Sequence, residues 1–258
     1  MRILSIPLIV CVLFFSGPSI AGQPERDPRA LAAVQQAIAA MGGSAAAARV
    51  TDTVVTGTIE PSSGSSVKGG AFTWKTAASE FKYEKRAGSS TQVLVSGHGH
   101  PKRIHNGTIT ALSLHIALAN PPLHLPALVL ADVVANQDYS VRLLGRADVS
   151  GVDAIKVRIG LDRDLIHSLV TPQDWYFDAL TGIPIRVEHR LPDNRRADNY
   201  VTAAEEFGDY RSASGLLVPF RILSYESGAL VAVETVSTVR FNSGLSSSEF
   251  DGPSGGAQ

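Results

Sequence analysis

The chain has 258 residues, with 23 basic and 24 acidic side chains and a formal net charge of −1. These charges are mixed, and the local cluster Arg195-Arg196 alternates with acids, which argues against nucleic-acid binding because that needs clustered Lys and Arg. Cys11 is the only cysteine, so a disulfide within the chain is excluded.

The first 21 residues are typical of a secretory signal peptide. An apolar run, Ile3 to Phe15, is followed by a Gly-Pro break and by small residues that allow cleavage at Ala21/Gly22. A retained membrane helix is the alternative, but the run is shorter than the roughly 20 residues that a span needs. Cys11 lies inside this run, where lipid attachment would delete the polar exit region of the signal. We therefore expect an exported, periplasmic protein that begins with a polar leader, 22–27.

A single amphipathic helix is predicted next, at about 28–41. Pro28 is tolerated in a first helical turn, Gly42-Gly43 closes the segment, and apolar residues recur at helical spacing between them. These residues are Leu31, Val34, Ile38 and Met41.

From Val50 onward the pattern has a period of two, which predicts strands with one apolar and one polar face. We count nine to eleven strands, separated by turn-rich segments at hairpin spacing. One-sided patterning favours an antiparallel sheet, because parallel sheets are buried on both faces. The apolar members are Phe72 and Trp74, Phe81 and Tyr83, Ile155, Val157 and Ile159, Ile185 and Val187, and a set sharing one face opposite Glu234: Val231, Val233, Val239 and Phe241.

Ser113–Gln137 breaks this pattern, because it is apolar with helical spacing and is split by Pro121-Pro122. It is either a core helix or a lid over an apolar opening, since a sheet with one dry face needs cover. Because the sequence contains no linker of the length that separates domains, we expect a single domain at 28–251 and a flexible tail at 252–258. The serine-rich stretch from Ser246 is expected to fray.

Catalytic signatures are absent from the sequence: it has no nucleophile elbow, phosphate-binding loop, HExxH or CxxC motif. We therefore predict a non-enzymatic protein without a cofactor. The best metal candidates are His98, His100 and His105, with the first two expected on one side of an extended segment. A glycine-rich hairpin end with exposed histidines is the alternative.

The remaining acidic residues favour structural roles. Asp162 and Asp164 are expected to cap a short helix, and Glu205-Glu206 to form a solvated strand edge. Asp178 starts a turn in which Gly182 supplies a positive φ, so this stretch is expected to turn the chain and not to catalyse.

The C-terminal third combines a D-x-x-T-G-x-P hairpin, an aromatic strand, G-x-x-x-P and a closing F-D, formed by Asp178, Thr181, Gly182, Pro184, Tyr210, Gly215, Pro219, Phe241, Phe250 and Asp251. In these motifs it resembles the outer-membrane lipoprotein carrier superfamily, the LolA/LolB-like periplasmic proteins. The resemblance implies a mainly β (α+β) fold, in which a strongly curved, unclosed antiparallel sheet (half-barrel) carries helices on its concave face. It also implies an apolar cavity for acyl chains and binding without chemistry.

The leading hypothesis is a periplasmic protein that binds a lipid or an acylated protein, with transient membrane association and an envelope protein partner as further expectations. The alternatives are an interaction scaffold with a filled core and a metal-dependent hydrolase that uses the three histidines. The expected cavity residues are apolar: Phe72, Trp74, Phe81, Tyr83, Leu128, Val133, Trp175, Phe177, Phe220 and Ile222.

Overall fold

One open antiparallel sheet forms the molecule's frame. The computed structural model describes residues 24–118, 123–193 and 196–251; the predicted signal peptide and the tail 252–258 lie outside the described residues. Thirteen strands follow the order β6-β5-β4-β3-β2-β1-β13-β12-β11-β10-β9-β8-β7. They are β1 (Asp52–Pro61), β2 (Gly70–Ala77), β3 (Glu80–Ala87), β4 (Ser90–Gly97), β5 (His100–His105), β6 (Thr108–Ala111), β7 (Tyr139–Val149), β8 (Val152–Leu161), β9 (Gln173–Asp178), β10 (Pro184–Asp193), β11 (Arg196–Ala213), β12 (Leu216–Glu226) and β13 (Ala229–Phe241).

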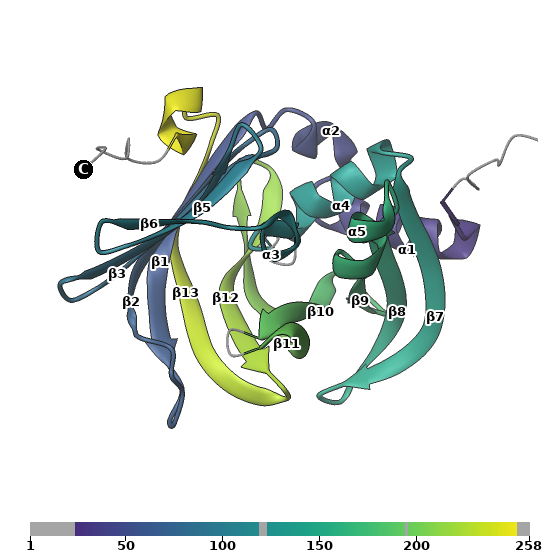
Figure 1. Ribbon diagram of the computed structural model, residues 1–258. Coiled ribbons are helices and arrows are strands. Elements are labelled where there is room, and N and C mark those ends of the chain that lie inside the picture. Colours follow the sequence, from purple (N-terminus) through teal and green to yellow (C-terminus); the bar gives the residue numbers. More distant parts are fainter. Residues whose placement is uncertain (1–23, 119–122, 194–195, 252–258) are drawn as a thin grey trace, which may run out of the picture.

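The predicted half-barrel is confirmed. The edge strands β6 and β7 do not pair with each other among the described residues, so the sheet stays unclosed. Strands β1–β6 form one wall, β7–β9 the opposite wall, and α3 and α4 lie between them (Figure 1). The predicted count of nine to eleven strands is too low. Strand β6 is short and exposed throughout, and β5 carries only Ile104 as a buried residue, so neither shows an apolar alternation.

The described residues form five α-helices and one 3-10 helix: α1 (Pro28–Ala40), α2 (Ser44–Ala47), α3 (Leu114–Leu118), α4 (Pro126–Ala135), α5 (Leu165–Val170) and η1 (Ser247–Phe250). The predicted first helix is confirmed. Asp27 caps it by accepting from the Arg29 N–H at 2.8 Å. At its end Gly42 has φ +117°, where a side chain would strike the Gly215 carbonyl. None of these helices has the length and hydrophobicity to cross a bilayer.

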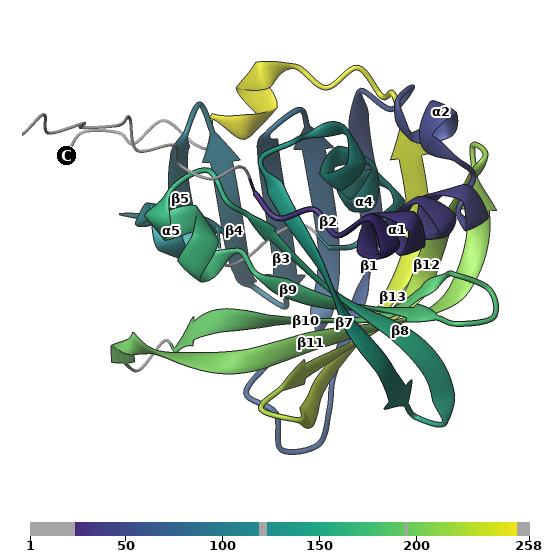
Figure 2. The same ribbon diagram turned by 90° about the vertical axis from the view of Figure 1, so that its right-hand side faces the viewer.

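The main core lies between α1, α4 and the concave face of the sheet. Val34 and Ile38 of α1 and Leu130 of α4 are buried against Trp175 and Phe177 of β9. Figure 2 shows α1 and α4 side by side above the strands. Helix α4 contributes fully buried residues to this core. The α4 part of the Ser113–Gln137 segment is therefore a core helix and not a lid.

The convex face of β8–β12 carries ion pairs across neighbouring strands, as the polar side of the alternation predicted. Asp174 accepts hydrogen bonds from Arg158 at 2.6 Å and lies 3.0 Å from the Lys156 ammonium. Burial works to raise the pKa of Asp174, but the hydrogen bonds from Arg158 and Lys156 outweigh it and hold this pKa below its usual value.

The prediction that Glu205 and Glu206 form a strand edge is wrong, because β11 pairs on both sides. Glu206 lies on the convex face and bonds Arg186 at 2.6 Å. Glu205 pairs with His189 at 3.2 Å on the other face. Neighbouring residues of a strand point to opposite faces, so two adjacent acids cannot share one solvated side.

The expected fraying from Ser246 is also wrong up to Asp251. Helix η1 places Phe250, which is 1% exposed, on a small cluster with Val93, Val95 and Ile104 on the convex side of β4 and β5. A salt bridge of 2.7 Å from Lys75 to Glu249 adds a second link. A short polar segment with one aromatic residue thus packs well because Val93, Val95 and Ile104 form a local apolar patch on this side of β4 and β5.

Candidate functional site: an apolar cavity between α4 and the sheet

A cavity of about 1020 Å³ lies between α4 and the β1–β5 wall and extends to the base of α5. Its size is at the upper end of the range for small-molecule sites, roughly 300–1,000 Å³. Apolar side chains dominate opposite walls: Leu128 and Val129 on α4, Trp74 and Phe81 on β2 and β3, and Leu161 at the end of β8. Such a lining suits an apolar ligand.

Helix α4 can form one wall because it is apolar on all sides. Its sequence PALVLADVVA has one charged residue, Asp132, and Pro126 occupies its first turn. Ala127 and Leu130 are buried in the core. Leu128 and Val129, on another side, are only partly buried and line the cavity. A helix that is apolar on all sides is usually fully buried. In α4, one apolar side packs in the core and another lines the cavity.

Four of the ten expected cavity residues line the cavity: Trp74, Phe81, Leu128 and Val133. The other six pack elsewhere on the concave side. Phe72, Tyr83 and Phe220 belong to an apolar cluster around β1, β2 and β13, and Trp175, Phe177 and Ile222 to the core that α1 and α4 cover. Alternation in the sequence identifies the concave face, but only the positions of the helices decide which part of that face stays uncovered.

One member of a buried polar pair, His124, lines the cavity. His124, just before α4, lies 2.6 Å from the Glu234 carboxylate of β13, and both side chains are mostly buried. The His124 ring lies 4.7 Å from the Trp74 ring centroid and 5.7 Å from that of Phe72. Burial, and next the Glu234 charge, raise the pKa of Tyr83. The pair therefore links the segment just before α4 to β13.

Sequence reasoning missed Glu234 because it placed this residue opposite the apolar face of β13, and that assignment is wrong. Val236 pairs with Gly57 and Thr238 with Thr56, so one extra residue interrupts the ladder. Such a bulge reverses the alternation on either side of it. Glu234 therefore faces the concave side together with Val236, and Val231 and Val233 do not share a face with Val239 and Phe241.

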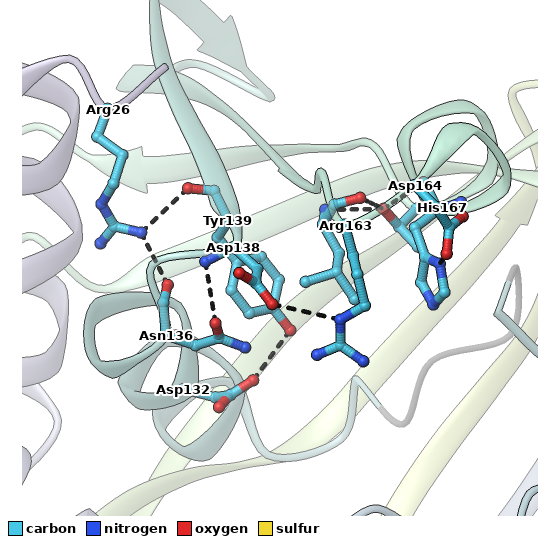
Figure 3. Close-up of polar contacts among 10 residues, drawn as sticks. Arg26, Asp132, Asn136, Asp138, Tyr139, Arg163, Asp164 and His167 are labelled. Atoms are coloured by element: carbon cyan, nitrogen blue, oxygen red, sulfur yellow. Dashed lines mark hydrogen bonds and ion pairs between the residues drawn. The ribbon is translucent and has the colours of Figure 1, made fainter. Parts of the chain in front are cut away.

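Hydrogen bonds and ion pairs hold the end of α4 and the base of α5 (Figure 3). The Tyr139 hydroxyl donates to Asp132 at 2.9 Å, and Arg163 pairs with Asp138 at 3.2 Å. Burial raises the pKa of Tyr139, with Asp132 adding to the effect. Tyr139 and Asp132 both line the cavity.

Arg26 anchors α4 from the other side, although the sequence placed it in a polar leader. Its guanidinium donates to the carbonyls of Asn136 at 2.9 Å, Tyr139 at 3.0 Å and Val133 at 3.0 Å. A cation at a helix C-terminus satisfies free carbonyls and also complements the helix dipole. No motif identifies an arginine with this role.

The three candidate metal ligands do not converge. His98 lies in the β4–β5 turn with φ +53° and contacts Asp251 at 3.1 Å and Glu80 at 3.4 Å, so it does not continue an extended segment with His100. His100 and His105 are the two ends of β5, roughly 16 Å apart at 3.3 Å per residue. Across the described residues, no three His, Cys, Asp or Glu side chains are grouped to hold a metal ion. The arrangement matches the hairpin end named as the alternative.

The turn prediction is confirmed, and the cap prediction is confirmed for Asp164, the N-cap residue of α5. The Asp178 carboxylate accepts the N–H groups of Leu180 and Thr181, each at 2.8 Å, and Gly182 has φ +77°. Asp164 caps α5 by accepting the His167 N–H at 3.0 Å. These carboxylates are bonded to backbone donors, which accounts for their presence without a catalytic role.

The geometry defines a class of protein: a half-barrel that encloses an apolar cavity with a helical plug. Solved structures of low sequence identity share this fold. A LolA superfamily protein from Nitrosomonas europaea is 13% identical and has a TM-score of 0.53, with 86% of this chain and 96% of that chain covered. The suspected resemblance is therefore confirmed for the fold.

Two further structures agree. A DUF1329 family protein from Desulfovibrio piger has a TM-score of 0.56 at 14% identity, covering 86% of this chain and 97% of that one. A candidate outer membrane lipoprotein-sorting protein domain from Vibrio parahaemolyticus has a TM-score of 0.55 at 14% identity, covering 86% and 96%. No protein-family model matches the sequence, and no curated protein is similar to it. At these identities the comparison shows the fold alone.

Proposed function

We propose that the protein binds the acyl chains of a lipid or of an acylated protein in the α4 cavity, as a periplasmic carrier without catalysis. The observation that carries this proposal is the cavity itself: about 1020 Å³, lined on opposite sides by Leu128, Val129, Trp74 and Phe81. Burial of an acyl chain there is favourable by about 25 cal/mol per Å² of apolar surface. Two structures with this fold, a LolA superfamily protein and a candidate lipoprotein-sorting domain, support the same class of ligand.

The cavity favours this function over the interaction scaffold with a filled core, because a scaffold gives no reason for apolar side chains on the uncovered side of α4. The hydrolase alternative required three histidines in one site, but one lies in the β4–β5 turn and the other two lie at the opposite ends of β5. The export signal at 1–21 and the domain bounds 28–251 remain part of the proposal.

The test is binding of a fluorescent fatty acid to the exported chain, with native mass spectrometry and solvent extraction to identify co-purified lipid. Ala131→Trp places an indole in the cavity, since Ala131 lines it from α4. Ala39→Trp is the matched control, because Ala39 is an exposed alanine near the end of α1. We expect Ala131→Trp to weaken binding about tenfold, the equivalent of 1.4 kcal/mol, and Ala39→Trp to leave it unchanged. Absence of binding to the unmodified chain, or equal binding by both variants, would refute the proposal.

A further inference from the structure

Helix α5 exposes apolar side chains that do not pack in the core of the protein. Leu165 is 73% exposed, Ile166 47% and Leu169 61%, whereas Val170 is buried. Seven large apolar side chains are exposed among the described residues, and three of them belong to this six-residue helix. Single exposed apolar residues are ordinary, but a contiguous group indicates an interaction surface.

The exposed group is built on an ordered base. Thr171 accepts the Leu161 N–H at 2.8 Å and donates to the His167 carbonyl at 2.8 Å, so the two ends of the α5 excursion are joined. Asp164 caps the helix and also contacts the His167 ring at 2.7 Å. The three side chains are thus presented by a fixed helix and not by a frayed loop.

The same helix adjoins the cavity. Leu161, Thr171 and Gln173, which flank α5 in the chain, line one end of the cavity. Helix α3 contacts α5, and its Ala117 and Leu118 line the cavity too. Figure 1 shows α3 and α5 close together between the two walls. A surface beside this end of the cavity would meet whatever delivers or receives an apolar ligand.

We propose that the exposed face of α5, Leu165, Ile166 and Leu169, docks the protein on a lipid bilayer with zwitterionic headgroups, beside the end of the cavity where acyl chains enter or leave. This inference rests on the proposed acyl-binding function. Three leucine-sized side chains are too few for the roughly 800 Å² per partner of a stable protein interface. They are enough for shallow insertion into lipid, where apolar burial alone drives binding.

The charges beside α5 determine the kind of bilayer. Arg163, which precedes α5, is neutralised because it pairs with Asp138, and Asp164 contacts His167. Asp162 leaves the surroundings acidic. Attraction to anionic lipid needs an excess of Lys or Arg near the surface. Docking should therefore occur on phosphatidylcholine vesicles and should not strengthen when phosphatidylglycerol is added.

The test is flotation of the exported chain with phosphatidylcholine vesicles. The variant Leu165→Ser/Leu169→Ser should bind at least about tenfold more weakly, because two apolar side chains no longer insert. Leu180→Ser is the matched control, since Leu180 is 91% exposed in the β9–β10 turn, away from α5. A wild-type chain that stays with the soluble fraction, a double variant that floats like wild type, or an equal loss for Leu180→Ser would overturn the proposal.

A second measurement is independent of how well the serine variant folds. In a Cys11→Ser background, Leu169→Cys and Leu180→Cys are labelled with an environment-sensitive fluorophore. Vesicles should shift the emission to the blue for the label at 169 and leave that at 180 unchanged; no shift at 169 contradicts docking.

The fatty-acid assay separates this inference from the proposed function. Fatty-acid binding that survives in the double variant, together with loss of flotation, supports both. A wild-type chain that floats through α5 but binds no fatty acid refutes the cavity function alone, whereas one that binds fatty acid but does not float refutes docking alone.

Discussion

Replacing Arg26 by Met should destabilise the protein by about 2 kcal/mol, a value that follows from the contacts of its guanidinium. The carbonyls of Val133 and Asn136 at the end of α4 and of Tyr139 at the start of β7 accept from it at 2.9 to 3.0 Å, and that of Val134 accepts at 3.4 Å. Hydrogen bonds from a charged donor contribute about 1.5–3 kcal/mol each when fully buried. Arg26 is only half-buried, and water can replace part of what it donates, so the sum is reduced to about 2 kcal/mol.

The assay is urea unfolding followed by tryptophan fluorescence, because Trp74 and Trp175 are both buried and report on the two walls. In a separate thermal scan, 2 kcal/mol corresponds to a fall in melting temperature of about 4–8 °C for a chain of this size. Arg26→Lys keeps the charge but loses the two-pronged donor, so its midpoint should lie between those of wild type and Arg26→Met. Arg29→Met is the matched control, since the Arg29 side chain is 80% exposed.

A midpoint for Arg26→Met equal to that of Arg29→Met would refute the anchoring role of Arg26. A changed denaturant slope would point instead to an altered unfolded or native state. If the anchor acts as described, fatty-acid binding should also weaken in Arg26→Met, because α4 forms one wall of the cavity.

Two further predictions concern carboxylates. Asp52 is buried and accepts the N–H groups of Ser243 at 2.7 Å and Gly244 at 2.9 Å, so Asp52→Ala should cost about 2–3 kcal/mol in thermal unfolding; a change below about 0.5 kcal/mol, the usual size for a surface substitution, would contradict this. The folded-state pKa of Asp174 lies below its unfolded value of about 3.9, so its contribution is complete above that value and is lost as pH falls through the folded pKa. Unfolding free energies measured between pH 7 and pH 2 should therefore fall less steeply at the acid end for Asp174→Asn than for wild type, and parallel curves would contradict the assignment.

Local signals in the sequence were enough to predict the elements whose causes are local. The helix at 28–40 and the turn at Asp178–Gly182 follow from capping residues, glycine positions and helical spacing within a few residues. The antiparallel sheet followed from alternation repeated over many segments, whereas its open, curved form was implied only by the family resemblance. These features need no knowledge of which strand lies beside which.

Features that depend on distant pairing could not be predicted. The Val236/Thr238 irregularity exists only in register with β1, and it decides that Glu234 enters the concave side. Phe250 looked like part of a frayed end because its cluster, Val93, Val95 and Ile104, lies about 150 residues earlier in the chain. The partners of Arg26 are backbone carbonyls more than 100 residues away, which leave no trace in side-chain pattern.

Helix α4 contributes both to the core of the fold and to the cavity lining. A helix that only had to pack on α1 and β9 would need one apolar stripe, with polar residues on its other sides. Instead Leu128 and Val129 face the cavity, while Ala127 and Leu130 fill the core. The cost of those two extra apolar residues in water is offset when an acyl chain covers them, so ligand binding should stabilise the protein, by RT ln(1 + [L]/Kd) for free ligand at concentration [L]. The melting temperature should rise with fatty-acid concentration for wild type but not for Ala131→Trp, if ligand in the α4 cavity stabilises the fold. Equal rises for the two proteins would contradict this.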